Sequence, residues 1–167
     1  VRITKGTALY TSNFTPEEML VGNKSPFVST WRTTAASETI TLPLRSGYTY
    51  NATVDWGDGT SSAITAHDDA DRIHTYASAG DHTVTIRGTL QALYFNGGGD
   101  KAKIISIPNL GDVGWTSFNH GFLGCSNLTT VAGGDVSAVT NMQGMFYGAT
   151  SANPDTSAWD SANVTNM

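Results

Sequence analysis

Short segments of β-forming residues, separated by turn residues, dominate the chain from residue 27 to residue 95. In the clearest of them, residues 48–56, every second residue is apolar and the residues between are Thr, Asn or Asp. This period of two predicts a β-strand with one buried and one exposed face. The predicted strands are Phe27–Arg32, Glu38–Leu44, Tyr48–Trp56, Ser61–Thr65, Arg72–Tyr76, His82–Arg87 and Leu90–Phe95. Short strands with Gly and Pro turns between them predict a β-sandwich.

A second pattern begins after Gly97-Gly98-Gly99-Asp100, where regular structure is interrupted. From Lys101 onward, apolar residues and glycines recur 24 positions apart. The pairs are Ile104/Leu128, Ile107/Val131, Trp115/Val139, Phe118/Met142, Phe122/Phe146 and Gly124/Gly148. Val139-Thr140-Asn141-Met142 also returns 25 positions later as Val164-Thr165-Asn166-Met167. A fixed period in the twenties predicts a leucine-rich-repeat solenoid, with a short strand and a helical turn in each unit.

The two ends of the chain suggest a piece of a longer protein. One repeat unit cannot bury its apolar face alone, so units are expected to stack on both sides, and the chain stops at Met167 within a unit. The first residues lack a starting Met and the apolar segment of a signal peptide. We therefore expect that the native protein continues.

The composition favours an extracellular β-rich module. Charged residues make up only 14% of the chain, and Thr, Ser, Asn and Gly fill most of its polar positions. The net charge of −5, without a cluster of Lys and Arg, argues against nucleic-acid binding. No apolar run approaches the roughly 18 residues of a membrane span, so no membrane insertion is expected in this segment. The single Cys125 excludes an intramolecular disulfide.

No arrangement of side chains predicts catalysis, so the chain is not expected to be an enzyme. The four histidines lack metal-ligand spacing, and Cys125 aligns with Ala149 in the repeat, as a small buried residue would. Asp68, Asp69 and Asp71 form an acidic loop that could hold Ca²⁺, which takes several oxygen ligands. Their spacing matches no calcium loop, so a solvated loop is the preferred interpretation. No other cofactor is expected.

The aromatic and Met side chains of the repeats recur with the repeat period, which predicts a core and not a ligand-stacking stripe. A binding surface is instead expected at exposed positions of the units, because loops and insertions in solenoids gather on one face. The candidate ligand-binding residues are Asn119, Gln143 and Tyr147.

Three segments resemble, in order, the PKD type of immunoglobulin-like sandwich. They are Val54-Asp55-Trp56-Gly57-Asp58-Gly59-Thr60, His74-Thr75-Tyr76 and Gly80-Asp81-His82-Thr83-Val84-Thr85-Ile86. The resemblance implies an extracellular spacer or adhesion domain that brings no catalytic residue. It also implies that Trp56, Gly57, Asp58 and Gly59 form a structural turn.

Two further segments carry resemblances. Residues 139–146, Trp159-Asp160 and residues 163–167 resemble the BspA-type leucine-rich repeats of microbial surface proteins, which implies adhesion or recognition. Residues 1–6 and 9–16 resemble the closing segment of a laminin-G or concanavalin-like jelly roll. That second resemblance implies a glycan-binding type of domain before Val1.

The sequence thus predicts a mainly β chain in three parts. Residues 1–26 are the tail of a jelly-roll domain plus a linker, residues 27–98 are a PKD-like β-sandwich, and residues 99–167 are truncated BspA-type leucine-rich repeats. The expected function is non-enzymatic recognition, adhesion and spacing at a cell or virion surface. The expected partner is a surface protein or glycan of a host or neighbouring cell. Two alternatives stay open: part of a phage tail fibre, where a homo-oligomer is expected, or an accessory binding module of a secreted polysaccharide-degrading enzyme.

Overall fold

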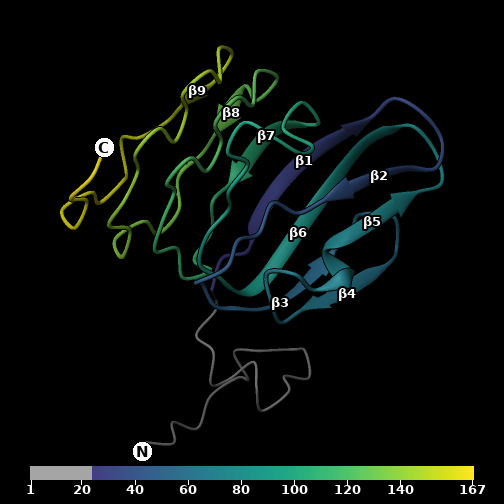
Figure 1. Cartoon of the computed structure of the whole chain (residues 1–167), viewed down its shortest axis with the longest axis horizontal. Coiled ribbons are helices and arrows are strands. Elements are labelled where there is room, and N and C mark those ends of the chain that lie inside the picture. Colours follow the sequence, from purple (N-terminus) through teal and green to yellow (C-terminus); the bar gives the residue numbers. More distant parts are fainter. Residues whose placement is uncertain (1–23) are drawn as a thin grey trace, which may run out of the picture.

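A seven-stranded sheet runs through residues 24–167, the part of the protein that the computed structural model describes, in the order β4-β3-β6-β1-β7-β8-β9 (Figure 1). A second sheet contains β2 and β5. The strands are β1 (Phe27–Thr33), β2 (Glu38–Thr41), β3 (Tyr50–Asp55), β4 (Ser61–Ile64), β5 (Ile73–Tyr76), β6 (Gly80–Leu90), β7 (Ile104–Asn109), β8 (Thr130–Val131) and β9 (Asn153–Pro154). The described chain is therefore mainly β, and its single helix is the 3₁₀ turn η1 (Ala70–Arg72).

The first half of the large sheet is antiparallel, with β6 paired to β3 on one side and to β1 on the other. In β3, Tyr50, Ala52 and Val54 are buried and the residues between them are exposed, as the period of two predicts. The ribbon of β2 and β5 packs across from this sheet. Its Ile40 and Tyr76 belong to the same buried cluster as β3, which gives two layers around one core.

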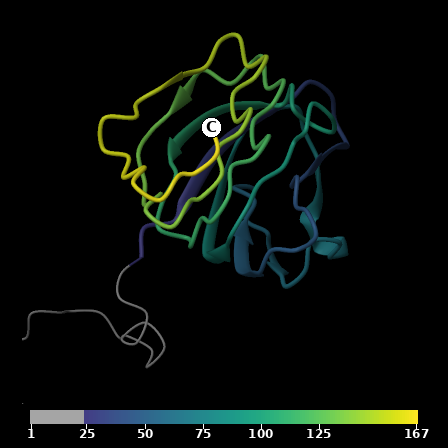
Figure 2. The same cartoon turned by 60° about the vertical axis from the view of Figure 1, so that its left-hand side comes forward.

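The second half of the large sheet is parallel and follows the repeat. Ile107 of β7 pairs with Val131 of β8, and Val131 pairs with Pro154 of β9. At a second edge, single parallel bridges join Ser117 to Asn141 and Asn141 to Asn166. Successive units therefore lie side by side in parallel register, and Figure 2 shows the chain beyond β7 winding as successive loops, green to yellow, beside the sheet.

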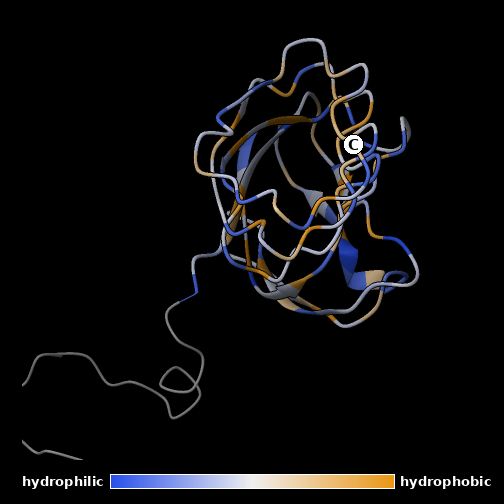
Figure 3. Ribbon diagram, turned by 90° about the vertical axis from the view of Figure 1, so that its left-hand side faces the viewer, coloured by the Kyte–Doolittle hydropathy of each residue, from blue (hydrophilic) through white to orange (hydrophobic). Residues whose placement is uncertain are grey.

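Apolar side chains of these loops fill the space between the parallel strands β7–β9 and the row of single bridges at Ser117, Asn141 and Asn166. The apolar residues that the 24-residue period pairs are all buried except Phe146, which is half-buried against the same core. In Figure 3, which looks at the C-terminal side of the molecule, hydrophobic stretches alternate with hydrophilic ones along the loops. The side chains of Trp115, Phe118, Phe122, Met142 and Met145 are thus core residues, and Phe146 and Trp159 are partly buried against them.

The large sheet continues across residues 98 and 99, where the sequence predicts a domain boundary. Strand β7 pairs with β1, so the sheet continues from one predicted part into the other. The segment after β6 also lies against the first repeat unit, since Phe95 N donates to Gly121 O (3.2 Å) and Gly97 N donates to Leu123 O (3.1 Å).

Three local predictions are corrected. The strand predicted over residues 90–95 is absent, because β6 extends to Leu90 and the residues after it bond to the repeat stack instead. The strand predicted over Glu38–Leu44 ends at Thr41, before Pro43, which has no N–H to donate. The helical turns predicted within the repeats are isolated turns, because His120, Gly124, Gly144 and Gly148 have positive φ, which interrupts a right-handed helix.

The predicted jelly-roll tail over residues 1–26 lies almost entirely outside the described residues. Within residues 24–167, no helix has the length and apolar character needed to cross a membrane.

Candidate functional site

The Trp56–Gly59 segment connects β3 to β4 and is held by side chains on both sides. Asp58 Oδ1 accepts hydrogen bonds from the N–H and the hydroxyl of Thr60, at 3.0 and 2.6 Å. Its other oxygen lies 2.7 Å from His74 Nε2. The hydrogen bond from the Thr60 hydroxyl above all, together with those from the Thr60 N–H and His74, holds the pKa of Asp58 at about 2, although burial acts in the opposite direction.

The same turn is anchored to a column of stacked rings. The His74 ring stacks on buried Trp56, with centroids 4.8 Å apart and planes 12° apart, and Tyr76 stacks on His82 at 3.6 Å. Tyr76 also donates its hydroxyl hydrogen to the Trp56 carbonyl (2.8 Å). Gly57 has φ +80°, and a Cβ there would overlap the carbonyl oxygen of Thr83. The side chains of Trp56 and Asp58 both have internal hydrogen-bond partners, so the geometry is that of a folding element.

The acidic loop of Asp68, Asp69 and Asp71 does not form a three-ligand cluster. Asp69 caps η1 by accepting the N–H of Asp71 (3.1 Å), and its second oxygen accepts the N–H and the hydroxyl of Thr65 (3.0 Å each). Across residues 24–167, no group of three or more His, Cys, Asp or Glu side chains could hold a metal ion. Cys125 is buried, and burial raises the pKa of its thiol to about 12.

Two of the three predicted binding residues meet on the repeat stack. Asn119 Nδ2 donates to Gln143 Oε1 (3.3 Å), and Asn166 Nδ2 lies 3.5 Å from the same oxygen. The three side chains come from successive units, although Asn166 is the counterpart of Asn141 in the repeat, two positions before Gln143. Its amide still reaches the Gln143 side chain, so the three amides lie in sequence across the stack. We call Asn119, Gln143 and Asn166 the amide row.

The backbone of the units sets this geometry. His120 N donates to Gln143 O (2.9 Å) and Met142 N donates to Asn166 O (2.8 Å), so neighbouring units stay in fixed register. Asn141 Oδ1 also accepts the N–H of Gln143 (2.9 Å), which fixes the turn that presents the Gln143 side chain. Gln143 and Asn166 are exposed, and Asn119 is half-buried.

An arginine from the first half of the chain stands at the Asn119 end of the amide row. Arg45 Nη1 donates to Asn119 Oδ1 (3.2 Å). The guanidinium lies 4.0 Å from the ring centroid of Tyr94 and 5.4 Å from that of Tyr48. We call Arg45, Tyr48 and Tyr94 the arginine corner. It joins the β2–β3 connection to the first repeat unit.

Tyr147, the third predicted binding residue, does not join the amide row. Its side chain is 76% exposed and lines a separate hollow of about 590 Å³. Other lining residues of this hollow are Met142, Met145, Trp159 and Met167. Trp159 Nε1 is buried there and, among the described residues, is the only buried side-chain nitrogen or oxygen without a hydrogen-bond partner.

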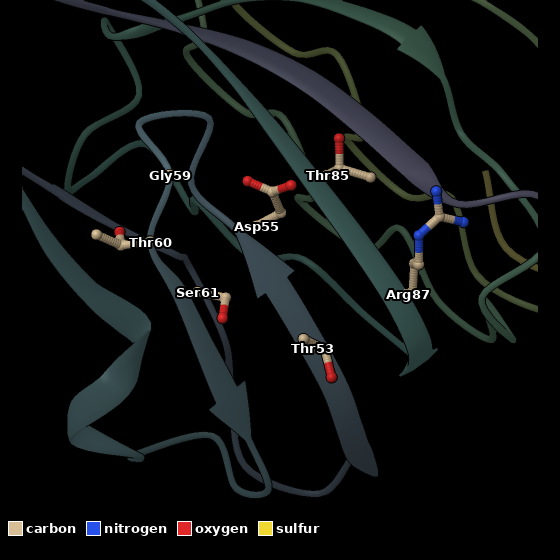
Figure 4. A pocket seen from close by; sticks show the side chains of 7 residues that line it. All are labelled: Thr53, Asp55, Gly59, Thr60, Ser61, Thr85 and Arg87. Carbon is tan, nitrogen blue, oxygen red and sulfur yellow. The ribbon is translucent and has the colours of Figure 1, made fainter. Parts of the chain in front are cut away.

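A second hollow, of about 370 Å³, lies on the outer face of the antiparallel half of the sheet. Figure 4 shows its side chains, which come from β3, β4, β6 and the turn between β3 and β4: Thr53, Asp55, Gly59, Thr60, Ser61, Thr85 and Arg87. Asp55, Thr53 and Arg87 are exposed and lie on the polar face that alternates with the buried one. This hollow is part of an open polar surface without an enclosed reactive group.

Sequence reasoning missed Arg45, Tyr94 and Asn166. Asn166 carries a partial signal, because the repeated Val-Thr-Asn-Met segment places it 25 positions after Asn141, on the unit next to Gln143 but two positions earlier in the repeat. Arg45 and Tyr94 carry none, since Arg45 meets Asn119 across 74 positions through tertiary packing alone.

Residues 116–167, about a third of the chain, match the model of a family described as "Mycoplasma protein of unknown function, DUF285". The matched region contains the amide row and most of the repeat stack but none of strands β1–β7. No curated protein and no solved structure matches the chain.

Proposed function

We propose that this chain is a non-enzymatic recognition and spacer module of a larger surface protein, and that it binds its partner along the amide row. In this proposal residues 27–98 are a PKD-like sandwich and residues 99–167 are BspA-type leucine-rich repeats. The module acts outside the cell, on a cell or virion surface. Its partner is a protein or glycan on a host or neighbouring cell.

The observation that carries the proposal is the contact of the Asn119, Gln143 and Asn166 amides, which come from successive units. An amide both donates and accepts hydrogen bonds, so a row of amides suits a ligand rich in hydroxyl and amide groups. Neighbouring parallel strands lie about 4.8 Å apart, so each unit adds one such group next to that of its neighbour. The match of residues 116–167 to DUF285 is compatible with a surface module of this kind.

Binding of the labelled chain to intact cells and to an array of neutral and acidic glycans tests the proposal. Gln143→Ala removes the central amide of the row, so we expect binding to weaken about tenfold, the loss of one or two hydrogen bonds. Thr53→Ala on the far sheet face is the control and should bind as the unmodified chain does. The absence of any bound cell or glycan, or equal binding by Gln143→Ala, would refute the proposal.

The phage-fibre alternative makes the same surface part of a virion appendage, and the polysaccharide-hydrolase alternative makes it an accessory binding module. Both keep the amide row as the contact surface. Mass spectrometry of fractionated native material separates them from the adhesin by the proteins that travel with these peptides: tail proteins, a glycosidase, or cell-envelope proteins.

A further inference from the structure

The guanidinium of Arg45 is held in place without a carboxylate beside it. Within residues 24–167, the Lys and Arg side chains that pair with a carboxylate are Lys24, Arg32 and Lys103. Arg45 is not among them. An arginine has five N–H donors. In the described part of the chain, only Nη1 of Arg45 has a hydrogen-bond acceptor, namely Asn119 Oδ1.

The arginine corner fixes the orientation of this guanidinium. The Tyr94 ring lies 4.0 Å from it and the Tyr48 ring lies 5.4 Å from it. The Arg45 backbone is fixed as well, since its N–H donates to the Tyr50 hydroxyl (3.2 Å) and its carbonyl accepts from that hydroxyl (3.1 Å). A half-buried arginine fixed in this way loses little side-chain entropy on binding, and its fork matches two oxygens of one carboxylate.

The surroundings select the kind of anion. The chain has a net charge of −5, which disfavours densely charged polyanions such as nucleic acids. The side chain bonded to Arg45 is Asn119, the first amide of the amide row, so the ligand beyond the carboxylate meets neutral donors and acceptors. This arrangement suits one carboxylate at the end of a hydroxyl-rich, otherwise neutral molecule.

We propose that the arginine corner and Asn119 form the subsite for the carboxylate of an acidic sugar that ends a neutral glycan lying along the amide row. This inference rests on the proposed recognition function and names its ligand class. A terminal sialic acid and a terminal glucuronic acid both supply the carboxylate.

The test uses glycans displayed on polymer and biolayer interferometry with the full chain. The probes are sialyllactose, a glucuronic-acid-terminated disaccharide, and the methyl ester of each, which keeps the sugar and removes the charge. We expect at least one acid to bind about tenfold more tightly than its ester, the difference that a charge-assisted bidentate contact supplies. Preference for the first or the second acid identifies the source of the carboxylate.

Variants show which residue produces the preference for the acid over its ester. Arg45→Gln should bind acid and ester alike, and Arg45→Lys should keep only part of the preference, because an ammonium lacks the planar fork. Arg87→Gln is the matched control: it removes the same charge from the exposed face of β6 and should keep the full preference. Gln143→Ala should weaken acid and ester equally.

An NMR titration of the unmodified chain covers the case in which the Arg45 variants do not fold. The Nε–H signal of Arg45 should shift with the acid and not with the ester. Any one of three results overturns the inference: equal binding of acid and ester, an acid preference that survives in Arg45→Gln, or an Arg45 Nε–H signal that does not shift. If cells are still bound in any of these cases, and Gln143→Ala still weakens that binding, the proposed recognition function stands without it. If the unmodified chain binds no cell and no glycan, both the proposed recognition function and this inference are refuted.

Discussion

Asp58 shows how one side chain organises the turn between β3 and β4. Its two oxygens join neighbouring Thr60 to His74, which lies on β5 and stacks on Trp56. The Asp58 side chain is 29% exposed, so water screens these contacts only in part. A carboxylate bonded to three donors is stabilised in its charged form, which is why its pKa falls to about 2.

The stability of the protein should therefore depend on Asp58 between about pH 4 and about pH 2. In the unfolded chain an Asp takes up its proton near pH 3.9, before the folded chain does, so acid favours unfolding in this window. We expect Asp58 to contribute about 1–2 kcal/mol above pH 4, after allowance for solvent screening, and to lose this contribution as pH falls to 2. Urea unfolding across this range measures it.

Asp58→Asn is the comparison, because an amide does not titrate. Other carboxylates with lowered pKa, such as Glu38, titrate in both proteins and cancel in the difference. The free energies of unfolding of the two proteins should differ most above pH 4 and converge toward pH 2. A constant difference across this range would show that the Asp58 charge has no stabilising partner in the folded state.

At the scale of the element, the repeat units approach one another closely. Gly111 and Gly134 form a parallel bridge 23 positions apart. A Cβ on Gly134 would lie 2.6 Å from the Gly111 backbone nitrogen and oxygen. On the other side, Gly111 lies against the backbone of Pro26 and Phe27. Three backbone segments thus meet where a side chain would not fit.

Gly134→Ala should destabilise the protein by about 1–3 kcal/mol, because backbone atoms on both units must move to admit the methyl group. Gly133→Ala is a matched control one position away, where the nearest atom to the new Cβ is Ala158 Cβ at 3.9 Å. Its free energy of unfolding should stay within about 0.5 kcal/mol of the unmodified value. Denaturant unfolding of both variants measures the contrast, and equal stabilities would mean that the units are spaced more loosely.

These elements also show what the sequence could predict. The alternation over residues 48–56 placed β3 and its buried face, and the 24-residue period placed the register of β7 with β8, because both depend on local pattern. The three-to-four spacing of apolar residues suggested helical turns, but left-handed residues such as His120 (φ 52°) interrupt them. The arginine corner and the docking of residues 95–97 on the stack depend on packing between distant segments, which no local pattern encodes.

At the scale of the whole molecule, the described residues share one apolar cluster. Aromatic contacts cross the predicted boundary: Phe27 meets Trp115 edge-on with ring centroids 5.5 Å apart, and Phe95 lies 6.3 Å from Phe122. Lys103 adds a polar tie, since it bonds to Asp100 (2.8 Å) and reaches back to Glu38 (3.1 Å). The antiparallel half of the sheet and the repeat stack therefore support each other.

This mutual support predicts that the antiparallel half and the first repeat unit unfold in one transition. Phe122→Ala removes a fully buried ring of the stack, at a cost of about 3–5 kcal/mol. Because the core is shared, the variant should weaken hydrogen-exchange protection in β3 and β6 as much as in residues 115–125. Exchange measured by mass spectrometry at increasing denaturant follows each region separately. If β3 and β6 keep their full protection while the stack opens, the residues on either side of position 98 fold as independent domains, as the sequence alone predicted.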